Sequence, residues 1–393
     1  MPIKKIILEK ANRLFRIPPE VNSFFRIEKK RTLIKRTEYI DLLSFNWNCS
    51  FDEDFSKTTE SLMPAGRESI MSLKEELAGW YLKTDKVRLN PKSEIYIGGG
   101  ISSSLQALST AFIDPGDIVF VPEISIPLYR RVTYISGGEP ITYSVNAVNN
   151  WQPDFEKVNS PLGRVAKFLI LNSPHNPTGA ALKSKDYEYL VWLAAKENIA
   201  IINDAAYRTL SGSVLDSFLS VKGSMKTGVE VSSFSYLFGL PAMNFGFVAG
   251  NKDLINGLKE TDRCNGHLIP AYFVNVALDG IRQFPGKNLK EIKSKFQKSA
   301  AEADRLLEIL SLESYGFNSI PFIWAKIKKR SRAVNAANIL KRRSQILSLP
   351  GNILGNSGEG YLRFSLTASA ESYQQAIKRT KSKLKLLKLD REE

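Results

Sequence analysis

The chain has 393 residues, of which 43% are hydrophobic, 24% charged and 10% aromatic, proportions typical of a folded globular enzyme rather than a disordered or fibrous chain. It contains two cysteines and two histidines, which are Cys49, Cys264, His175 and His267. So few thiols and imidazoles exclude a disulfide framework and argue against a metal site. We therefore expect no metal and a reducing compartment, the cytoplasm.

The net charge of +15 raises the question of an anionic partner. Basic residues concentrate in 4–36, 326–343 and 378–388, without the interleaved aromatic platform on which bases stack. We expect a solvated basic face rather than nucleic-acid binding. The N-terminus lacks the apolar stretch of a secretory signal, and no segment approaches the ~20 apolar residues of a membrane span, so no membrane partner is expected.

Between residues 94 and 250, short β-branched runs alternate with amphipathic stretches, which predicts an α/β fold with a mostly parallel sheet sandwiched by helices. In chain order the pattern predicts a strand at 94–97, a helix at 102–111, a strand at 118–121, a helix at 126–135, a strand at 166–171, a helix at 184–197, strands at 199–203, 229–234 and 245–249, and a helix at 271–283. These strands are apolar on both faces, as strands covered on two sides must be.

From about residue 287 the pattern changes. It predicts a long helix at 288–312, a strand at 322–327, a helix at 333–341, a strand at 362–366 and a last helix at 371–387. This order is typical of a smaller α+β domain. We therefore expect a large domain over 74–284 and a small domain over 285–393, which the N-terminal segment 1–73 joins.

Several motifs follow one another in the order and at the spacing of a known family. Leu171-Asn-Ser-Pro-His-Asn-Pro-Thr-Gly179 resembles the Asn-Pro-Thr-Gly loop of the class I/II aminotransferases, the fold-type-I pyridoxal phosphate enzymes. Asn203-Asp-Ala-Ala-Tyr207 resembles their Asp-x-x-Tyr strand end, and the segment from Ser233-Phe-Ser235 to Gly246 resembles their lysine segment. Tyr361-Leu-Arg-Phe-Ser365 resembles their C-terminal arginine strand. The resemblance extends over roughly 74–366 and implies the large aminotransferase domain.

Four polar residues of these motifs suit such a cofactor and a carboxylate substrate. A carboxylate at a strand end, Asp204, can pair with a protonated pyridine nitrogen and keep the ring an electron sink. Tyr207 and Asn176 can donate hydrogen bonds to the ring's phenolate oxygen. Arg363 offers a bidentate fork for the α-carboxylate of an amino or keto acid. The resemblance implies these same roles, with Asn176 shared between cofactor and substrate.

The family's Schiff-base lysine is expected directly after Ser235, where this chain has Tyr236. A phenol cannot form an imine, so Tyr236 could act only as an acid or base at this position. The nearest lysines, Lys226 and Lys252, lie ten residues before and sixteen residues after Tyr236. A slip in register therefore does not restore the amine, and the sequence predicts a divergent member without the Schiff-base lysine.

Further departures fall on groups that bind the cofactor. Asn244 stands in place of the phosphate-binding arginine, Ile101 in place of a hydroxyl-bearing residue, and Ile126 in place of the aromatic that stacks on the ring. A glycine turn at Gly100 and the following helix start can still bind an anion through backbone N–H groups, with Ser102 compensating. The cofactor site implied by the resemblance comprises Gly100, Ile101, Ser102, Ile126, Asn176, Asp204, Tyr207, Ser233, Ser235 and Asn244.

Several functions stay open at this point. Our main expectation is an aminotransferase-like protein that lacks the catalytic lysine, recognises an amino or keto acid, and binds pyridoxal or pyridoxamine phosphate noncovalently or binds no cofactor. One alternative is a catalytically inactive subunit that supports a partner, in a homodimer or in a heterodimer with an active paralogue. Another is a conventional pyridoxal phosphate-dependent transaminase with an unrecognised lysine. A nucleic-acid binder rests on net charge alone.

Overall fold

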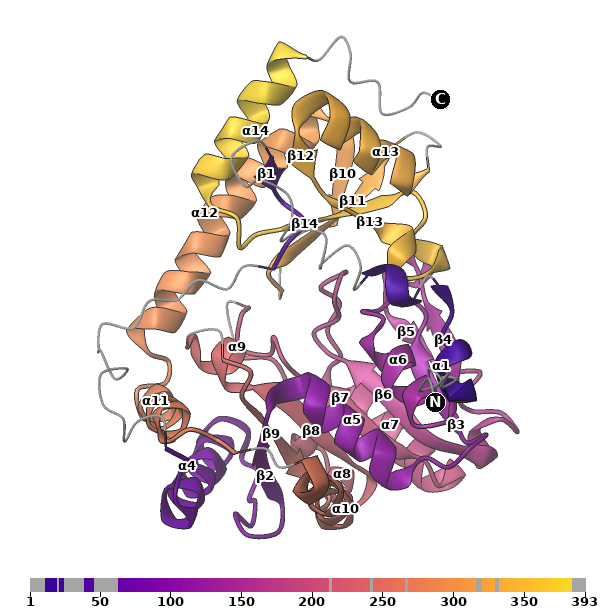
Figure 1. Cartoon of the computed structure of the whole chain (residues 1–393), viewed down its shortest axis with the longest axis vertical. Helices are drawn as coiled ribbons and strands as arrows, with labels where there is room; N and C mark the ends of the chain where they lie inside the picture. Colours follow the sequence, from indigo (N-terminus) through magenta and orange to yellow (C-terminus); the bar gives the residue numbers. More distant parts are fainter. Residues whose placement is uncertain are drawn as a thin grey trace, which may run out of the picture.

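The computed structural model describes residues 11–19, 21–24, 39–45, 63–211, 214–240, 243–265, 268–315, 320–328 and 332–383. Cys49 and His267 lie outside these residues, and Cys264 is an exposed free thiol. Figure 1 shows a large helix-covered sheet in the lower part of the molecule and a smaller sheet with its helices above it.

The large sheet of the described chain has eight strands. They are β2 (Ile95–Gly98), β3 (Ile118–Pro122), β4 (Glu139–Val145), β5 (Pro153–Asp154), β6 (Ala166–Asn172), β7 (Ala200–Asp204), β8 (Gly228–Ser233) and β9 (Gly246–Gly250). Their order across the sheet is β2-β9-β8-β7-β6-β3-β4-β5. The strands β3, β4, β6, β7 and β8 pair in parallel, whereas β2, β5 and β9 pair antiparallel. Asn172, Asp204 and Ser233 therefore end three neighbouring strands at one edge of the sheet.

Helices cover both faces of this sheet. They are α4 (Arg67–Asp85), α5 (Gly100–Phe112), α6 (Leu128–Ile135), α7 (Ser184–Glu197), α8 (Ser224–Thr227), α9 (Phe234–Phe238), α10 (Lys252–Asn265) and α11 (Ala271–Arg282). Because side chains alternate along a strand, Ile201 of β7 packs with α4, α7 and α11, whereas Ile202 packs with α5, α6 and α10. The predicted helix-sandwiched, mostly parallel sheet is confirmed.

The smaller sheet is antiparallel and has its own core. Its strands, in the order β10-β11-β14-β13, are β10 (Leu312–Tyr315), β11 (Phe322–Ile327), β14 (Tyr361–Ser365) and β13 (Leu349–Pro350). The helices packed with it are α12 (Lys287–Ile309), α13 (Ala333–Ile339) and α14 (Ala370–Ser382). The short N-terminal strand β1 (Ile40–Asp41) pairs in parallel with β12 (Ile346–Leu347), and α1 (Asn12–Phe15) lies near α6. The domain boundaries at 73/74 and 284/285 stay predictions.

Some predicted boundaries are wrong, and local backbone chemistry explains why. The long helix ends at Ile309 instead of 312, because Ser311 adopts a left-handed φ of 55° and Leu312 already begins β10. The helix expected from 126 begins at Leu128, with Pro127 as its N-cap. Within the described residues α14 ends at Ser382, and the rest of the helix predicted to reach 387 lies outside them.

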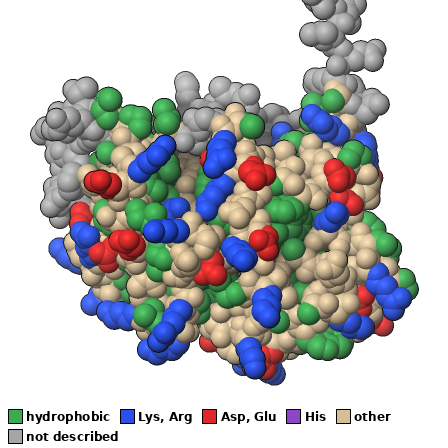
Figure 2. All heavy atoms as spheres, turned by 90° about the horizontal axis from the view of Figure 1, so that it is seen from below, with side chains coloured by type: hydrophobic (Ala, Val, Ile, Leu, Met, Phe, Trp, Pro, Cys, Tyr) green, Lys and Arg blue, Asp and Glu red, His purple; other side chains and the backbone are tan. Residues whose placement is uncertain are grey.

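Charged side chains are mixed on the surface. On the face seen in Figure 2, Lys and Arg side chains are interspersed with acidic and apolar ones and do not merge into one basic patch. A continuous basic stripe is the usual footprint of nucleic-acid binding. None of the described helices combines the length and the apolar character needed to cross a bilayer. Nor do the described residues contain a group of three His, Cys, Asp or Glu side chains placed to hold a metal ion.

Candidate active site

A cavity of about 180 Å³ opens at the carboxyl ends of β6, β7 and β8. The residues that line it are Gly100, Ile101, Ser102, Ile126, Leu128, Tyr129, Asn172, Asn176, Asp204, Ala206, Tyr207, Ser233, Tyr236, Met243 and Asn244. Ten of the twelve residues singled out in the sequence are among them. A larger, open groove of about 710 Å³ lies over β5 and the start of α7, away from these motifs.

Asp204 is a buried carboxylate at the centre of this cavity wall. Its Oδ2 accepts a hydrogen bond from the Tyr129 hydroxyl at 2.7 Å, and its Oδ1 accepts one from the Ala206 N–H at 3.2 Å. Burial raises the pKa of Asp204 to about 6, against the opposing effect of these two hydrogen bonds. Tyr129 was missed in the sequence, because α6 brings it to Asp204 across 75 positions of the chain and no local spacing signals the pairing.

Asn176 links the cofactor side of the cavity to Arg363. The Arg363 Nη1 donates to Asn176 Oδ1 at 3.2 Å, and the Asn176 backbone N–H donates to Asn172 Oδ1 at 2.8 Å. The Asn176 side chain is also hydrogen-bonded to Tyr207. Arg363 itself does not line the cavity but lies directly behind Asn176 on β14, with 4% of its surface exposed. The two motifs that the resemblance assigns to substrate recognition are therefore in contact.

The loop that carries Asn176 is held by a buried histidine. His175 Nε2 lies 2.8 Å from the Ile124 carbonyl oxygen, which can only accept, so Nε2 is the protonated nitrogen. Nδ1 then accepts from the Thr178 hydroxyl at 2.8 Å. Burial lowers the pKa of His175 to about 4, so the ring is neutral at physiological pH. Both ring nitrogens of His175 are therefore occupied in fastening the loop.

The amino end of α5 can receive an anion. Its N-cap is Gly99, which has no side chain to cap the first N–H groups, and Gly100 has a left-handed φ of 86°. A Cβ added to Gly100 would lie 2.9 Å from Asn244 Oδ1, so the glycine permits this close approach. Ser102 is exposed beside these N–H groups. The cradle is therefore built from backbone dipoles and neutral side chains, without an arginine.

The lysine-segment residues divide between cavity and core. Ser233 and Tyr236 line the cavity, whereas Ser235 turns inward and accepts a hydrogen bond from the Met243 N–H at 3.1 Å. The Tyr236 ring stacks on Tyr207, with ring centroids 5.6 Å apart. No lysine is present among the described residues that line the cavity. Ser235, predicted to contact the cofactor, instead fixes the turn between α9 and β9.

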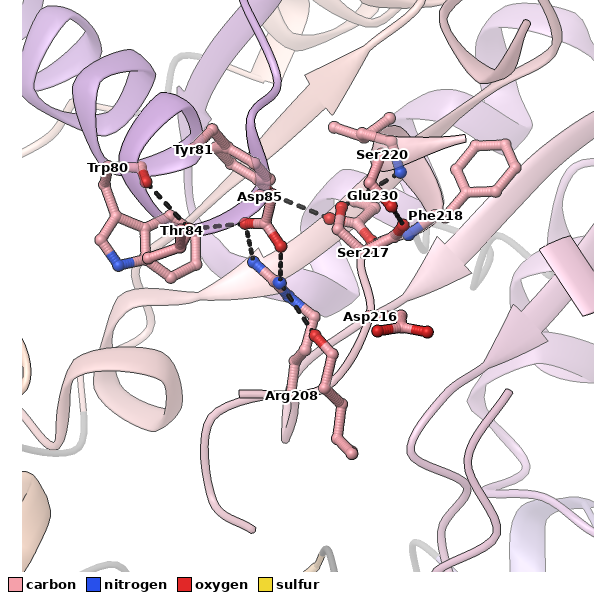
Figure 3. Close-up of polar contacts among 12 residues, drawn as sticks. Trp80, Tyr81, Thr84, Asp85, Arg208, Asp216, Ser217, Phe218, Ser220 and Glu230 are labelled. Atoms are coloured by element: carbon pink, nitrogen blue, oxygen red, sulfur yellow. Dashed lines mark hydrogen bonds and ion pairs between the residues drawn. The ribbon is translucent and has the colours of Figure 1, made fainter. Parts of the chain in front are cut away.

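A second buried polar cluster surrounds Arg208 and Glu230 (Figure 3). Arg208, with 1% of its side chain exposed, forms a bidentate pair with Asp85 of α4 at 2.6 and 3.0 Å. It also donates to the Leu215 carbonyl at 3.1 Å and lies over the Trp80 ring at 5.0 Å. Arg208 directly follows Tyr207, which lines the cavity, and therefore anchors this part of the cavity wall to α4.

Glu230 completes this buried cluster. It accepts hydrogen bonds from the Tyr81 hydroxyl at 2.9 Å, the Phe218 N–H at 2.8 Å and Asn203 Nδ2 at 3.3 Å. Burial raises the pKa of Glu230, and the nearby Arg208 guanidinium opposes that rise. Asn203 directly precedes Asp204 in β7, and Arg208 directly follows Tyr207. The segment that presents Asp204 and Tyr207 is therefore anchored at both ends to the same buried cluster of Asp85, Arg208 and Glu230.

Comparison with known proteins identifies the family of this chain. A family model described as "Aminotransferase class I and II" matches residues 58–379, which is most of the chain. The chain belongs to the class I and II aminotransferase family. Membership confirms the predicted family and implies pyridoxal phosphate as cofactor and amino and keto acids as substrates. The predicted loss of the lysine and the noncovalent mode of binding stay predictions.

Relatives of this aminotransferase-family chain include enzymes named for one substrate. It is 28% identical over 396 residues to "LL-diaminopimelate aminotransferase" of Moorella thermoacetica, covering 95% of this chain and 97% of that protein. It is 29% identical over 313 residues to the protein of that name from Aquifex aeolicus, covering 79% and 80%. A substrate-bound structure of BacF from Bacillus subtilis superposes with a TM-score of 0.86 at 22% identity, covering 96% and 98%. The structural likeness shows the shared fold.

Replacing Asp204 with asparagine is expected to stabilise the fold near pH 7.5. In the unfolded chain the carboxyl ionises at its ordinary pKa of 3.8, but in the folded protein only at about 6. Between these pH values the folded state therefore binds more protons than the unfolded state, and the free energy of unfolding falls as pH rises. Above about pH 6 the ionised Asp204 lowers the free energy of unfolding by roughly 3 kcal/mol. Asparagine can keep both contacts, accepting from Ala206 and donating to Tyr129.

Urea unfolding of both proteins at about pH 4, 5, 6 and 7.5 measures this effect. The stability difference between variant and wild type is expected to grow through this range and to level off above pH 6. His175 titrates in the same range in both proteins, and so cancels from the difference. Parallel pH curves for the two proteins would contradict the raised pKa of Asp204.

Proposed function

We propose that this chain binds pyridoxal or pyridoxamine phosphate noncovalently in the cavity at the end of β7 and acts on an amino or keto acid. The observation that carries the proposal is that Tyr236 lines the cavity and directly follows Ser235, where the sequence resemblance predicts the lysine. The other groups that suit the cofactor are present on the same wall. A site that keeps the ring and carboxylate contacts but offers a phenol supports binding without a covalent link.

The fit of such a cofactor can be judged from the donor and acceptor set. Asp204 would hold the ring nitrogen, and Asn176 with Tyr207 would hold the phenolate oxygen. The α5 start with Ser102 and Ser233 would hold the phosphate, through N–H groups and hydroxyls instead of a guanidinium. These residues fit the group but lack its strongest family contacts. When bound, the cofactor supplies an electron sink for charge that develops beside it.

The chain's own residues then have separable tasks. Arg363, whose Nη1 donates to Asn176 Oδ1, would bind the substrate carboxylate through its guanidinium. Burial and the neighbouring Tyr236 and Asp204 raise the pKa of Tyr207, so its hydroxyl keeps its proton and donates a hydrogen bond. The Tyr236 hydroxyl would hold or deliver a proton beside the substrate. Tyr129 fixes the Asp204 carboxylate from behind.

A second candidate is a conventional lysine-tethered transaminase. The names of the relatives and the family match favour it over noncovalent chemistry. It requires a lysine from outside the described residues that line the cavity, such as one in the segments 25–38 or 46–62. A third candidate, an inactive subunit that supports a partner, draws on the loss of the phosphate-binding arginine at Asn244.

One titration separates these candidates. Purified protein is titrated with pyridoxal phosphate and, separately, with pyridoxamine phosphate, and binding is followed by absorbance. The pyridoxal sample is then reduced with borohydride and its intact mass is measured. We expect binding of at least one form and an unchanged mass. A mass increase by one cofactor would replace the proposal with the conventional enzyme, and binding of neither form would replace it with the inactive subunit.

A further inference from the structure

An aromatic cluster lies beside Arg363 and shares two residues, Tyr207 and Tyr236, with the lining of the cavity. We define it as Phe45, Tyr207, Tyr236 and Phe322. The Phe45 ring lies 5.2 Å from Tyr236, 5.4 Å from Phe322 and 6.2 Å from Tyr207, measured between ring centroids. Phe322 is buried, whereas the other three rings are half-buried. The cluster therefore has a packed base and an accessible aromatic surface.

Arg363 is built into this cluster. The guanidinium carbon lies 4.1 Å from the centroid of the Phe322 ring, and Nη1 donates to Asn176 Oδ1. Stacking on the ring and the hydrogen bond to Asn176 fix the plane of the guanidinium. A carboxylate bound by Arg363 would consequently hold the rest of its molecule against aromatic side chains.

The charges around the site are few. Asp204 is the charged residue among the described residues that line the cavity or belong to the aromatic cluster. Arg363, which contacts the cavity residue Asn176, is a nearby cation. The remaining lining is apolar, hydroxyl or amide. Among these described residues, a charged distal group of a substrate would find no further ionic partner, at a large desolvation cost.

We propose that the substrate is an amino or keto acid with one carboxylate and an aromatic side chain, an inference that rests on the proposed function. Its carboxylate binds Arg363 and its ring packs against Phe45, Tyr207 and Tyr236. The charge inventory disfavours a diamino dicarboxylic acid, whose second carboxylate and second ammonium find no partners among these residues. In this respect the chain departs from the substrate for which its relatives are named.

Calorimetric titration with three keto acids tests the side-chain preference. Phenylpyruvate, pyruvate and 2-oxoglutarate share the same 2-oxo acid end and differ in carrying an aromatic ring, only a methyl group or a second carboxylate. Each is titrated into the full-length protein with and without pyridoxamine phosphate. We expect phenylpyruvate to bind about tenfold or more tightly than the other two. Equal or tighter binding of 2-oxoglutarate or pyruvate would overturn the inference while leaving the proposed function in place.

Variants separate the ring contact from the carboxylate contact. Phe45→Leu is expected to remove most of the advantage of phenylpyruvate while leaving pyruvate binding unchanged. Arg363→Met is expected to weaken all three keto acids. Trp192→Leu, which removes an aromatic ring that is 52% exposed on α7, is the matched control and should change none of them. Unchanged phenylpyruvate selectivity in Phe45→Leu would overturn the inference. If no keto acid binds the wild type under either condition, the proposed function fails, and the inference fails with it.

Discussion

Replacement of Arg208 by methionine is expected to lower the free energy of unfolding by about 3–5 kcal/mol. Arg208 is almost fully buried and is the cation that neutralises Asp85 and faces Glu230. Methionine preserves much of the apolar stem but leaves two carboxylates in a region that water does not reach. Because a domain of this kind has a net stability of about 5–15 kcal/mol, a loss of this size is a large part of the total.

Urea unfolding followed by circular dichroism measures the loss, with Arg282→Met as the matched control. The Arg282 side chain is 55% exposed and pairs with Glu76 at 2.8 Å, so its replacement should cost less than about 1 kcal/mol. The triple variant Arg208→Met, Asp85→Asn, Glu230→Gln should recover part of the stability, because it leaves no unpaired charge. Equal effects of the Arg208 and Arg282 replacements would contradict a structural role for the buried pair.

The double substitution Tyr236→Lys with Asn244→Arg is expected to link pyridoxal phosphate covalently to the protein. Both positions line the cavity, and the change supplies the primary amine and the phosphate-binding guanidinium that the family uses. Charge-assisted hydrogen bonds to the phosphate should tighten cofactor binding by about tenfold to a hundredfold. Borohydride reduction followed by peptide mass mapping is the measurement, and residue 236 should carry the added mass.

Three controls accompany this substitution. Tyr236→Phe with Asn244→Arg should tighten binding without any covalent link, since it lacks the amine. Tyr189→Lys places a lysine at an exposed position on α7, where tyrosine is 41% accessible, and should remain unlabelled. Wild-type protein should also remain unlabelled. Labelling of the wild type at another lysine would show that a different residue supplies the amine.

The central strands could be predicted from sequence because burial on both faces makes them short, apolar and β-branched. The strand β9 was predicted, but its antiparallel direction between β2 and β8 was not, because strand direction leaves no local signature in such a run. The strand β4, between β3 and β5, was not predicted, since most of it is only half-buried and its apolar pattern is weak. The helix α10 was not predicted, because it is largely polar, with few apolar positions.

The site residues that belong to sequence motifs could be predicted, whereas contacts between segments distant in sequence could not. Three of the four motifs line one cavity because they end neighbouring strands or lie on the loop beside those ends, and the fourth contacts that loop through Arg363 and Asn176. Tyr129 and Phe45 gave no signal, because their partners lie far away in the chain. An arginine directly after the Tyr207 motif, within an otherwise apolar stretch, was the one available hint of a buried pair.

The alternation of Asn203 with Asp204, and of Tyr207 with Arg208, limits how this protein can be re-engineered. Asp204 and Tyr207 line the cavity, whereas their neighbours Asn203 and Arg208 contact the buried carboxylates of Glu230 and Asp85. Libraries that randomise whole loops here would mostly yield unfolded clones. Diversity is better introduced at Ile126, Leu128 and Met243, whose apolar side chains line the cavity. New specificities should therefore come from the apolar rim, with the strand ends kept constant.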